Sequence, residues 1–201
     1  MICPALFDEA NKLRRFTLGV MRELDVRGID SAILDLPGTN ESLALLEEQT
    51  LAAWREDARD AAAQFGATHI LSIRAGALYA PPELPGWRYA ALDGAKQLSA
   101  MLRAQVLSQR EAGKALTREK LLEEGRKNGA MLSGWSLSAT MLAELETARA
   151  HTPSQHRMIE HREIGGAGLW LRAEPGESGA QSATLASMIA HSLEDAGEAQ
   201  T

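Results

Sequence analysis

Short apolar runs alternate along this chain with stretches in which apolar residues recur at helical spacing. Residues 1–6, 31–36 and 69–73 are apolar runs. Between them, apolar residues recur every three or four positions, first over residues 10–24 and then over residues 46–65. Asp8 is the predicted N-cap of the first of these helices, and Gly28 is its predicted stop. A strand, a helix and a second strand in this order form a right-handed crossover with parallel strands. The alternation predicts a three-layer α/β fold in which helices cover both faces of a mostly parallel sheet.

Composition excludes several classes of protein. A chain of 201 residues that is 45% hydrophobic and 24% charged has the make-up of one globular domain, so we expect a single domain over residues 1–201. Its one cysteine, Cys3, cannot close an intramolecular disulfide, and we expect it to be a small buried residue. The net charge of −6 argues against nucleic acid as a partner.

The sequence also predicts neither export nor a membrane span. No apolar run approaches the roughly 18 residues that cross a bilayer. The first apolar run is too short for a signal peptide, and Asp8 and Glu9 follow it at once. We therefore expect a cytoplasmic protein.

The pattern changes after a strand predicted over residues 87–92. Three helical patterns follow: residues 98–106 up to Gly113, a second after the N-cap candidate Thr117, and a third after Ser136. Three consecutive helices within an α/β alternation predict a helical cap, inserted at about residues 93–150, over the strand ends. Strands are then expected at residues 158–164 and 169–173, and a last helix at 181–193.

The segment THILSIRAGALYA, residues 68–80, bears most directly on chemistry. A predicted strand runs there into Ser72-Ile73-Arg74-Ala75-Gly76, which has the layout of a nucleophile elbow. In such a turn the residues two before and two after the nucleophile are small, as Ser72 and Gly76 are. The central residue is Arg74, whose guanidinium stays protonated and cannot attack a carbonyl. The segment predicts an elbow without ordinary nucleophilic chemistry.

Two interpretations of Arg74 remain open at this point. It could receive an anion, because the tip of an elbow faces the N-terminus of the following helix. It could instead be a structural arginine paired with Asp8, Glu9 or Asp35, because buried charges are normally paired. Asp8, Glu9 and Asn11 lie where a strand passes into a helix, and ligands of open α/β sheets bind at the carboxyl ends of strands. We expect these three residues to line a pocket.

Other polar motifs have structural interpretations. Ser136 in the run GWSLS is expected to cap the following helix rather than act as a nucleophile. His151, His156 and His161 are five residues apart, a spacing that does not converge on a metal, and we expect them on the surface. His69 opens a strand and is expected to be a structural histidine.

Several of these segments resemble the α/β-hydrolase superfamily, and within it the second type of exosortase-A-associated hydrolase. Residues 4–15, PALFDEANKLRR, resemble the segment after an early strand that usually supplies an oxyanion-hole amide. Residues 35–42, DLPGTNES, are similar to an Asp-Leu-x-Gly-x-Gly-x-Ser loop, with Asn40 replacing the second glycine. The elbow of that group also carries an arginine, and residues 93–146 resemble its cap region.

The resemblance implies an α/β-hydrolase-type fold with a helical cap. It also implies a role near exopolysaccharide export and protein sorting in a bacterium, nominally as a hydrolase of an ester or other acyl substrate. Together with the residue patterns, it gives an expected set of ligand-binding residues: Phe7, Asp8, Glu9, Asn11, Asp35, Asn40, Arg74 and Ala75.

The resemblance extends to the acid of a catalytic triad. Residues 169–173, the PGES loop and the helix after it resemble the segment that supplies this acid, which would be Glu177 or, as second choice, Glu174. The chain ends at Thr201, before the strand and loop that would deliver the catalytic histidine, and it begins at what would be an internal strand. We therefore expect a pared-down version of the fold without a complete triad.

Three functional hypotheses follow. The first is a hydrolase-fold protein that lacks Ser-dependent activity, and the second is a non-catalytic binding or partner protein that holds an anionic ligand at Arg74. The third is an enzyme that uses Asp8, Glu9 or Glu177 as an acid or base without a covalent step. No cofactor or metal is predicted, because there is no P-loop, no G-x-G-x-x-G after a strand and no paired metal-ligand spacing. The expected partner is a small molecule, and a homo-oligomer remains an option.

Overall fold

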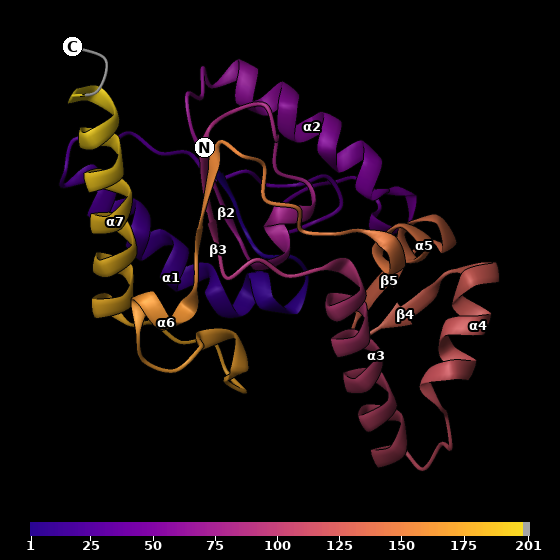
Figure 1. Cartoon of the computed structure of the whole chain (residues 1–201). Helices are drawn as coiled ribbons and strands as arrows, with labels where there is room; N and C mark the ends of the chain where they lie inside the picture. The colour runs from indigo at the N-terminus through magenta and orange to yellow at the C-terminus, as the bar shows by residue number, and fades with distance from the viewer. Residues whose placement is uncertain (199–201) are drawn as a thin grey trace.

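Four parallel strands form the central sheet in the computed structural model, which describes residues 1–198 (Figure 1). They are β1 (Ile2–Cys3), β2 (Ile70–Ile73), β3 (Gly86–Tyr89) and β6 (His156–Ile159), and they lie in the order β1-β2-β3-β6. Every neighbouring pair is parallel. The carboxyl ends of the strands therefore meet at one edge of the sheet, and the predicted α/β class with a mostly parallel sheet is confirmed.

Residues 31–36, expected as a full strand, contribute only one bridge, between Ile33 and Ile2. Two hydrogen bonds hold it: the amide of Ile2 donates to the carbonyl of Ala32, and the amide of Leu34 donates to the carbonyl of Ile2. A segment at the edge of a sheet has a neighbouring strand on one side only. Its apolar pattern is therefore not enough to extend the ladder of backbone hydrogen bonds beyond one bridge. If the segment around Ile33 is counted as the second strand along the chain, the strands lie side by side in the order 2-1-3-4-5. This is a common order of doubly wound sheets.

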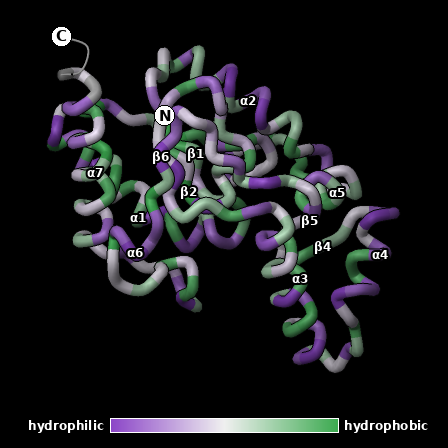
Figure 2. Tube along the Cα trace, viewed as in Figure 1, coloured by the Kyte–Doolittle hydropathy of each residue, from purple (hydrophilic) through white to green (hydrophobic). Residues whose placement is uncertain are grey.

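Helices cover both faces of the sheet. α1 (Asp8–Asp25) and α7 (Gly179–Glu198) pack side by side on one face, and α2 (Leu51–Gln64) lies on the other (Figure 1). Apolar residues divide accordingly into two clusters: Ile73 and Tyr89 of the strands face α1 and α7, whereas Ile70 faces α2. Hydrophobic residues gather on the central strands (Figure 2). The three layers follow from this alternation of faces.

The ends of α1 differ in part from expectation. Asp8 was the predicted N-cap, but the helix begins at Asp8 and Phe7 holds the cap position without a side-chain hydrogen bond. Asp8 instead pairs with Lys12 at 2.9 Å, one turn along the helix. A carboxylate in the first turn is still favourable because it faces the positive end of the helix dipole. Gly28, with φ of 72°, follows the helix as predicted.

A helical lobe follows β3. It consists of α3 (Gly94–Glu111), α4 (Arg118–Asn128) and α5 (Ala139–Thr147), which pack on one another. These are the three helices that the sequence predicts. Thr117 caps α4 as expected, because its hydroxyl accepts from the amide of Lys120.

An antiparallel hairpin within the lobe was not predicted. β4 (Ala130–Leu132) and β5 (Trp135–Leu137) are joined by Ser133 and Gly134, whose φ angles are 52° and 88°. Two positive φ angles are what a two-residue hairpin turn needs. The prediction that Ser136 caps the next helix is therefore wrong. Ser136 lies in β5 and donates to Glu47, whereas Ser138 accepts from the amide of Met141 and caps α5.

Four other elements are shorter or of another type than expected. Residues 46–65 form a 3₁₀ turn η1 (Leu46–Glu48) and then α2, and the segment after β2 is a five-residue 3₁₀ helix, η2 (Arg74–Leu78). Residues 158–164 divide between β6 and α6 (His161–Ile164). Residues 169–173 are not a strand, because η3 (Leu169–Leu171) is a 3₁₀ turn. Short apolar runs do not distinguish strand from helix by periodicity alone.

A helix that crosses a bilayer must be both long and apolar. Over residues 1–198, none of the helices combines the length and the apolar character needed to cross a bilayer.

Candidate functional site

After each of three neighbouring strands, the chain passes through a non-glycine residue with a positive φ angle. Phe7, four residues beyond β1, has φ of 56°, Arg74 follows β2 with φ of 53°, and Ala90 follows β3 with φ of 46°. Each such residue costs roughly 1–3 kcal/mol, and this strain collects at functional sites. β1 and β2 are also where the strand order reverses, the place at which open α/β sheets bind ligands. The carboxyl edge of the sheet is therefore the candidate site.

Arg74, the central residue of the predicted elbow, is held by a carboxylate. Its Nε donates to Glu9 Oε2 at 2.9 Å and its Nη2 donates to Glu9 Oε1 at 3.0 Å. Nη1 donates to the carbonyl of Ala90 at 2.9 Å. The side chain of Arg74 is 11% exposed and that of Glu9 is 15% exposed. The structure thus forms the predicted arginine–carboxylate pair, with Glu9 rather than Asp8 or Asp35 as the partner.

An aromatic wall that the sequence did not reveal borders this pair. The guanidinium carbon of Arg74 lies 4.2 Å from the centre of the Trp170 ring, a cation–π contact. Trp170 meets His161 edge-on, with ring centres 4.8 Å apart. Tyr89 Oη lies 2.7 Å from His161 Nδ1. Trp170 was missed because its segment was interpreted as a strand, and His161 because it was expected on the surface.

Both nitrogens of His161 are engaged. Burial raises the pKa of Tyr89 to about 12, although nearby Arg74 acts in the opposite direction, so the phenol stays protonated. Its hydroxyl can then donate to Nδ1 of His161, which leaves the proton on Nε2, 3.2 Å from the carbonyl of Gly166. His161 is therefore half-buried and held by two neighbours, not a histidine on the open surface.

Four predicted pocket residues do not join Arg74. Asn40 donates to the carboxylate of Asp35 within their own exposed loop, and Asn40 itself has φ of 44°. Asp8 is exposed and bound to Lys12, and Asn11 is exposed on α1. Within residues 1–198, none of these four side chains contacts the guanidinium by a hydrogen bond or ion pair.

Phe7 and Ala75 are core residues. Phe7 is 2% exposed and packs between Trp54 and Trp135, with ring centres 6.0 and 5.7 Å away. Ala75 is fully buried. Their side chains are closed to a ligand, which leaves only their backbone groups for such a contact, and the expectation that Phe7 and Ala75 bind a ligand stays a prediction.

Glu177 lies in an exposed segment between η3 and α7. The expectation of an acid there depends on a strand over residues 169–173, which the chain does not form. Nothing in the described structure brings Glu177, or the equally exposed Glu174, to Arg74. The acid role expected for Glu177 or Glu174 therefore stays a prediction.

A second buried arginine lies on β3. Arg88 is 3% exposed, donates from Nε to His156 Nδ1 at 3.1 Å and donates from Nη1 to the carbonyl of Ala77 at 2.8 Å. His156 Nε2 lies 2.6 Å from the carbonyl of Leu84. Burial lowers the pKa of His156, Arg88 lowers it further, and the hydrogen bond to Leu84 acts in the opposite direction. His156 is thus a buried neutral histidine, and its predicted surface position is wrong.

This arrangement predicts a pH-dependent stability. Because the pKa of His156 in the folded chain is below its ordinary value of 6.5, the unfolded chain binds more protons as the pH falls through 6.5. The unfolding free energy should therefore decrease from pH 7.5 to pH 5, as measured by urea titrations at several pH values. His156→Gln should flatten the decrease, while His151→Gln, at an exposed position, should leave it unchanged. An equal slope in wild type and His156→Gln would contradict the assignment.

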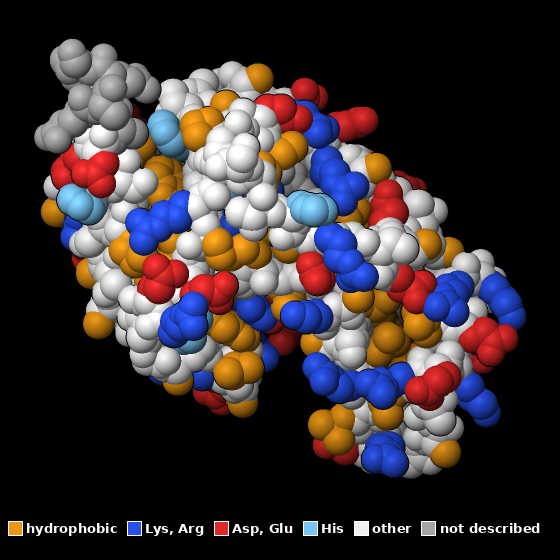
Figure 3. All heavy atoms as spheres, viewed as in Figure 1, with side chains coloured by type: hydrophobic (Ala, Val, Ile, Leu, Met, Phe, Trp, Pro, Cys, Tyr) orange, Lys and Arg blue, Asp and Glu red, His pale blue; other side chains and the backbone are white. Residues whose placement is uncertain are grey.

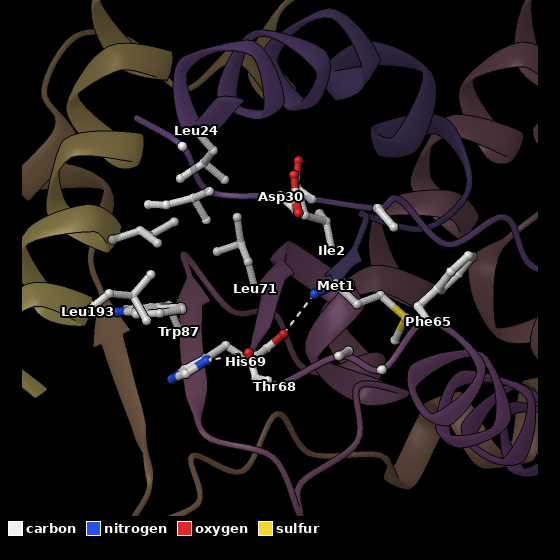
Figure 4. Close-up of a pocket in the computed structure, with 17 residues that line it drawn as sticks. Met1, Ile2, Leu24, Asp30, Phe65, Thr68, His69, Leu71, Trp87 and Leu193 are labelled. Carbon is white, nitrogen blue, oxygen red and sulfur yellow. Dashed lines mark hydrogen bonds between the residues drawn. The ribbon is translucent and has the colours of Figure 1, made fainter. Parts of the chain in front are cut away.

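A cavity of about 570 Å³ lies at the opposite, amino edge of the sheet (Figure 4). Leu24, Leu71 and Leu193 converge on it, and the amino group of Met1 donates to the carbonyl of His69 at 2.7 Å. The His69 ring stacks on Trp87, and burial lowers the pKa of both His69 and the Met1 amino group. The walls are mainly apolar, and the hydroxyl of Thr68 lies 3.0 Å from Nδ1 of His69 among them. The structural role expected for His69 stays a prediction.

Neither a metal site nor a similar known protein points to a function for this site. Over the described part of the chain, no group of three or more His, Cys, Asp or Glu side chains is placed to hold a metal ion. Comparison of the chain with protein-family models, with curated proteins and with solved structures found no match. The function is therefore argued from the site itself.

Proposed function

We propose that this chain is a non-catalytic binding protein built on an α/β-hydrolase-like framework, with Arg74 as the receptor for a small carboxylate or phosphate. One observation carries the proposal: the tip of the elbow-like turn holds a guanidinium that already grips one carboxylate in bidentate geometry. The parallel sheet and the turn after β2 support the hydrolase-like framework.

Glu9 serves in this proposal as an internal stand-in for the ligand. The planar fork of arginine matches a carboxylate or a phosphate, and such pairs are among the strongest hydrogen bonds in proteins. Three of the five N–H groups of Arg74 are used, two on Glu9 and one on Ala90. A ligand anion binds by displacing Glu9 or by sharing the remaining N–H groups. Glu9 therefore sets the affinity by competing for the same guanidinium.

The other groups near the turn support binding over acyl hydrolysis. Ser72, the serine of the elbow segment, is fully buried, and its hydroxyl donates to the carbonyl of Trp87 at 3.4 Å. Burial raises the pKa of Cys3 to about 12, so it remains a thiol rather than a nucleophilic thiolate. His156 and His161 each have both ring nitrogens engaged. Among residues 1–198, no activated nucleophile is available at this edge of the sheet.

Calorimetric titration with acetate and with inorganic phosphate tests the proposal. Glu9→Gln removes the competing charge while keeping the shape of the side chain, and should raise the affinity by about tenfold, equal to roughly 1.4 kcal/mol. Arg74→Gln should abolish binding. Glu146→Gln is the matched control, because Glu146 forms a similar bidentate pair with Arg126 on the exposed lobe.

Three results would refute the proposal. The receptor is not Arg74 if Glu9→Gln and Glu146→Gln change the affinity equally, or if Arg74→Gln binds like wild type while circular dichroism shows it folded. Labelling of one serine by a fluorophosphonate probe, abolished by unfolding, would show an activated nucleophile and contradict a non-catalytic role.

A further inference from the structure

The charge of the chain is unevenly distributed. Residues 94–128, from α3 to the end of α4, carry eight Lys and Arg against four Glu, a net charge of +4 within a chain of net charge −6. The remaining residues therefore sum to −10. A basic segment on an acidic protein indicates a local partner of negative charge.

A groove runs between α3 and α4 on this basic segment. Two adjoining hollows of about 280 and 350 Å³ share Arg118 and Glu119 as lining residues. Apolar residues line both walls of the groove. Leu98, Leu102 and Val106 lie on α3, and Leu116 and Leu122 lie on the opposite wall. Figure 3 shows hydrophobic side chains of this lobe at the surface, bordered by Lys and Arg. The groove is concave and apolar at its base.

The length of the groove fits a helix. Its lining residues on α3 extend from Ala95 to Arg110, a span of roughly 22 Å at 1.5 Å per residue, or about four turns. Grooves of this kind take an amphipathic helix whose apolar residues recur at i, i+3, i+4 and i+7.

The rim of the groove carries unpaired positive charge. Arg103, Arg110 and Arg118 are exposed, and within residues 1–198 none of them forms an ion pair. Two glutamates also line the groove, but Glu146 is bound at 3.0 and 2.6 Å by Arg126. Glu119, beside Arg118, is the remaining carboxylate. The rim therefore favours an acidic occupant.

We propose that the α3–α4 groove is a docking site for an acidic amphipathic helix of a partner protein. The apolar face of that helix covers the leucine and valine floor, and its carboxylates meet the three rim arginines. A membrane surface fits less well, because the apolar residues line a hollow instead of projecting from a convex face. The groove does not include Arg74, so this site and the proposed anion receptor succeed or fail separately.

Fluorescence anisotropy with a labelled 16-residue peptide tests the proposal. The probe has Leu at i, i+3, i+4 and i+7 spacing and Glu at the flanking positions. Its controls are a scrambled peptide of the same composition and a version with Lys in place of Glu. The triple variant Arg103→Gln, Arg110→Gln, Arg118→Gln should weaken binding at least tenfold. The matched triple Arg14→Gln, Arg15→Gln, Arg22→Gln makes the same charge change at exposed positions of α1 and should alter binding less than twofold.

Val106→Glu, on the floor, should also weaken binding of the acidic peptide at least tenfold. The proposal is overturned if the scrambled peptide binds as tightly as the probe, or if the two triple variants lose affinity equally. It is overturned as well if the chain sediments with phosphatidylglycerol vesicles at a salt concentration at which the peptide does not bind, since the basic lobe would then be a membrane-contact surface.

Discussion

Gly76→Ala is expected to lower the unfolding free energy by about 3 kcal/mol or more, as overpacking against backbone does. A methyl group at this position would overlap the carbonyl oxygens of Cys3 and Pro4, which belong to the chain leaving β1. Neither backbone atom can rotate away as a flexible side chain would. For a chain of this length the loss corresponds to a fall of roughly 6–12 °C in Tm, measurable by circular dichroism.

Gly179→Ala is the matched control. Gly179 opens α7, has no neighbour within 4 Å of an added methyl group and has no left-handed backbone. Alanine there should leave Tm unchanged or raise it slightly, because alanine favours helix. If Gly76→Ala melted within 2 °C of wild type, the turn after β2 would not be packed against the end of β1 as described, and the elbow-like geometry would be wrong.

Arg88→Ala is expected to destabilise the fold by about 2–5 kcal/mol, the range for leaving buried groups unpaired and opening a cavity. Arg88 donates to His156 and to the carbonyl of Ala77, and no carboxylate within residues 1–198 forms an ion pair with it. Because no carboxylate in this range offsets the loss of water around the guanidinium, burial lowers the pKa of Arg88. Urea unfolding of wild type and variant measures the loss.

Arg88→Met separates packing from charge. Methionine keeps much of the volume and removes a buried cation, a change that is often close to neutral in proteins. It should therefore cost less than half of what Arg88→Ala costs. Equal losses in the two variants would mean that the hydrogen bonds of the guanidinium, and not its volume, hold this part of the core together.

The sequence predicted the elements that depend on local pattern. The helix over α1, the three lobe helices and the parallel strands follow from apolar spacing, and Gly76 was identified as a position that must stay small. Where the pattern was short, the prediction was wrong. Residues 169–173 and Ser133-Gly134 show why: an apolar run of five residues suits a strand or a 3₁₀ turn equally, and a hairpin turn depends on backbone angles.

The candidate site was predicted only in part. Arg74 and Glu9 were both identified, because an arginine in an elbow and a carboxylate at a strand end each stand out in the sequence. Trp170 and His161 come from a segment almost one hundred residues further along the chain, and no local pattern joins them to Arg74. Asp35 and Asn40 stood out equally well, yet they satisfy each other in their own loop.

The sequence alone determined the elements that follow from the spacing of apolar residues, and it singled out Arg74 as the central residue of the elbow segment. Both depend only on residue type and near neighbours in the chain. Which carboxylate pairs with that arginine, which histidines are buried and where the rim arginines of the lobe lie were decided only by the tertiary structure. The physical reason is the same in each case: hydrogen bonds, burial and cation–π contacts depend on distances between residues far apart in sequence. The parallel order of the strands sets those distances.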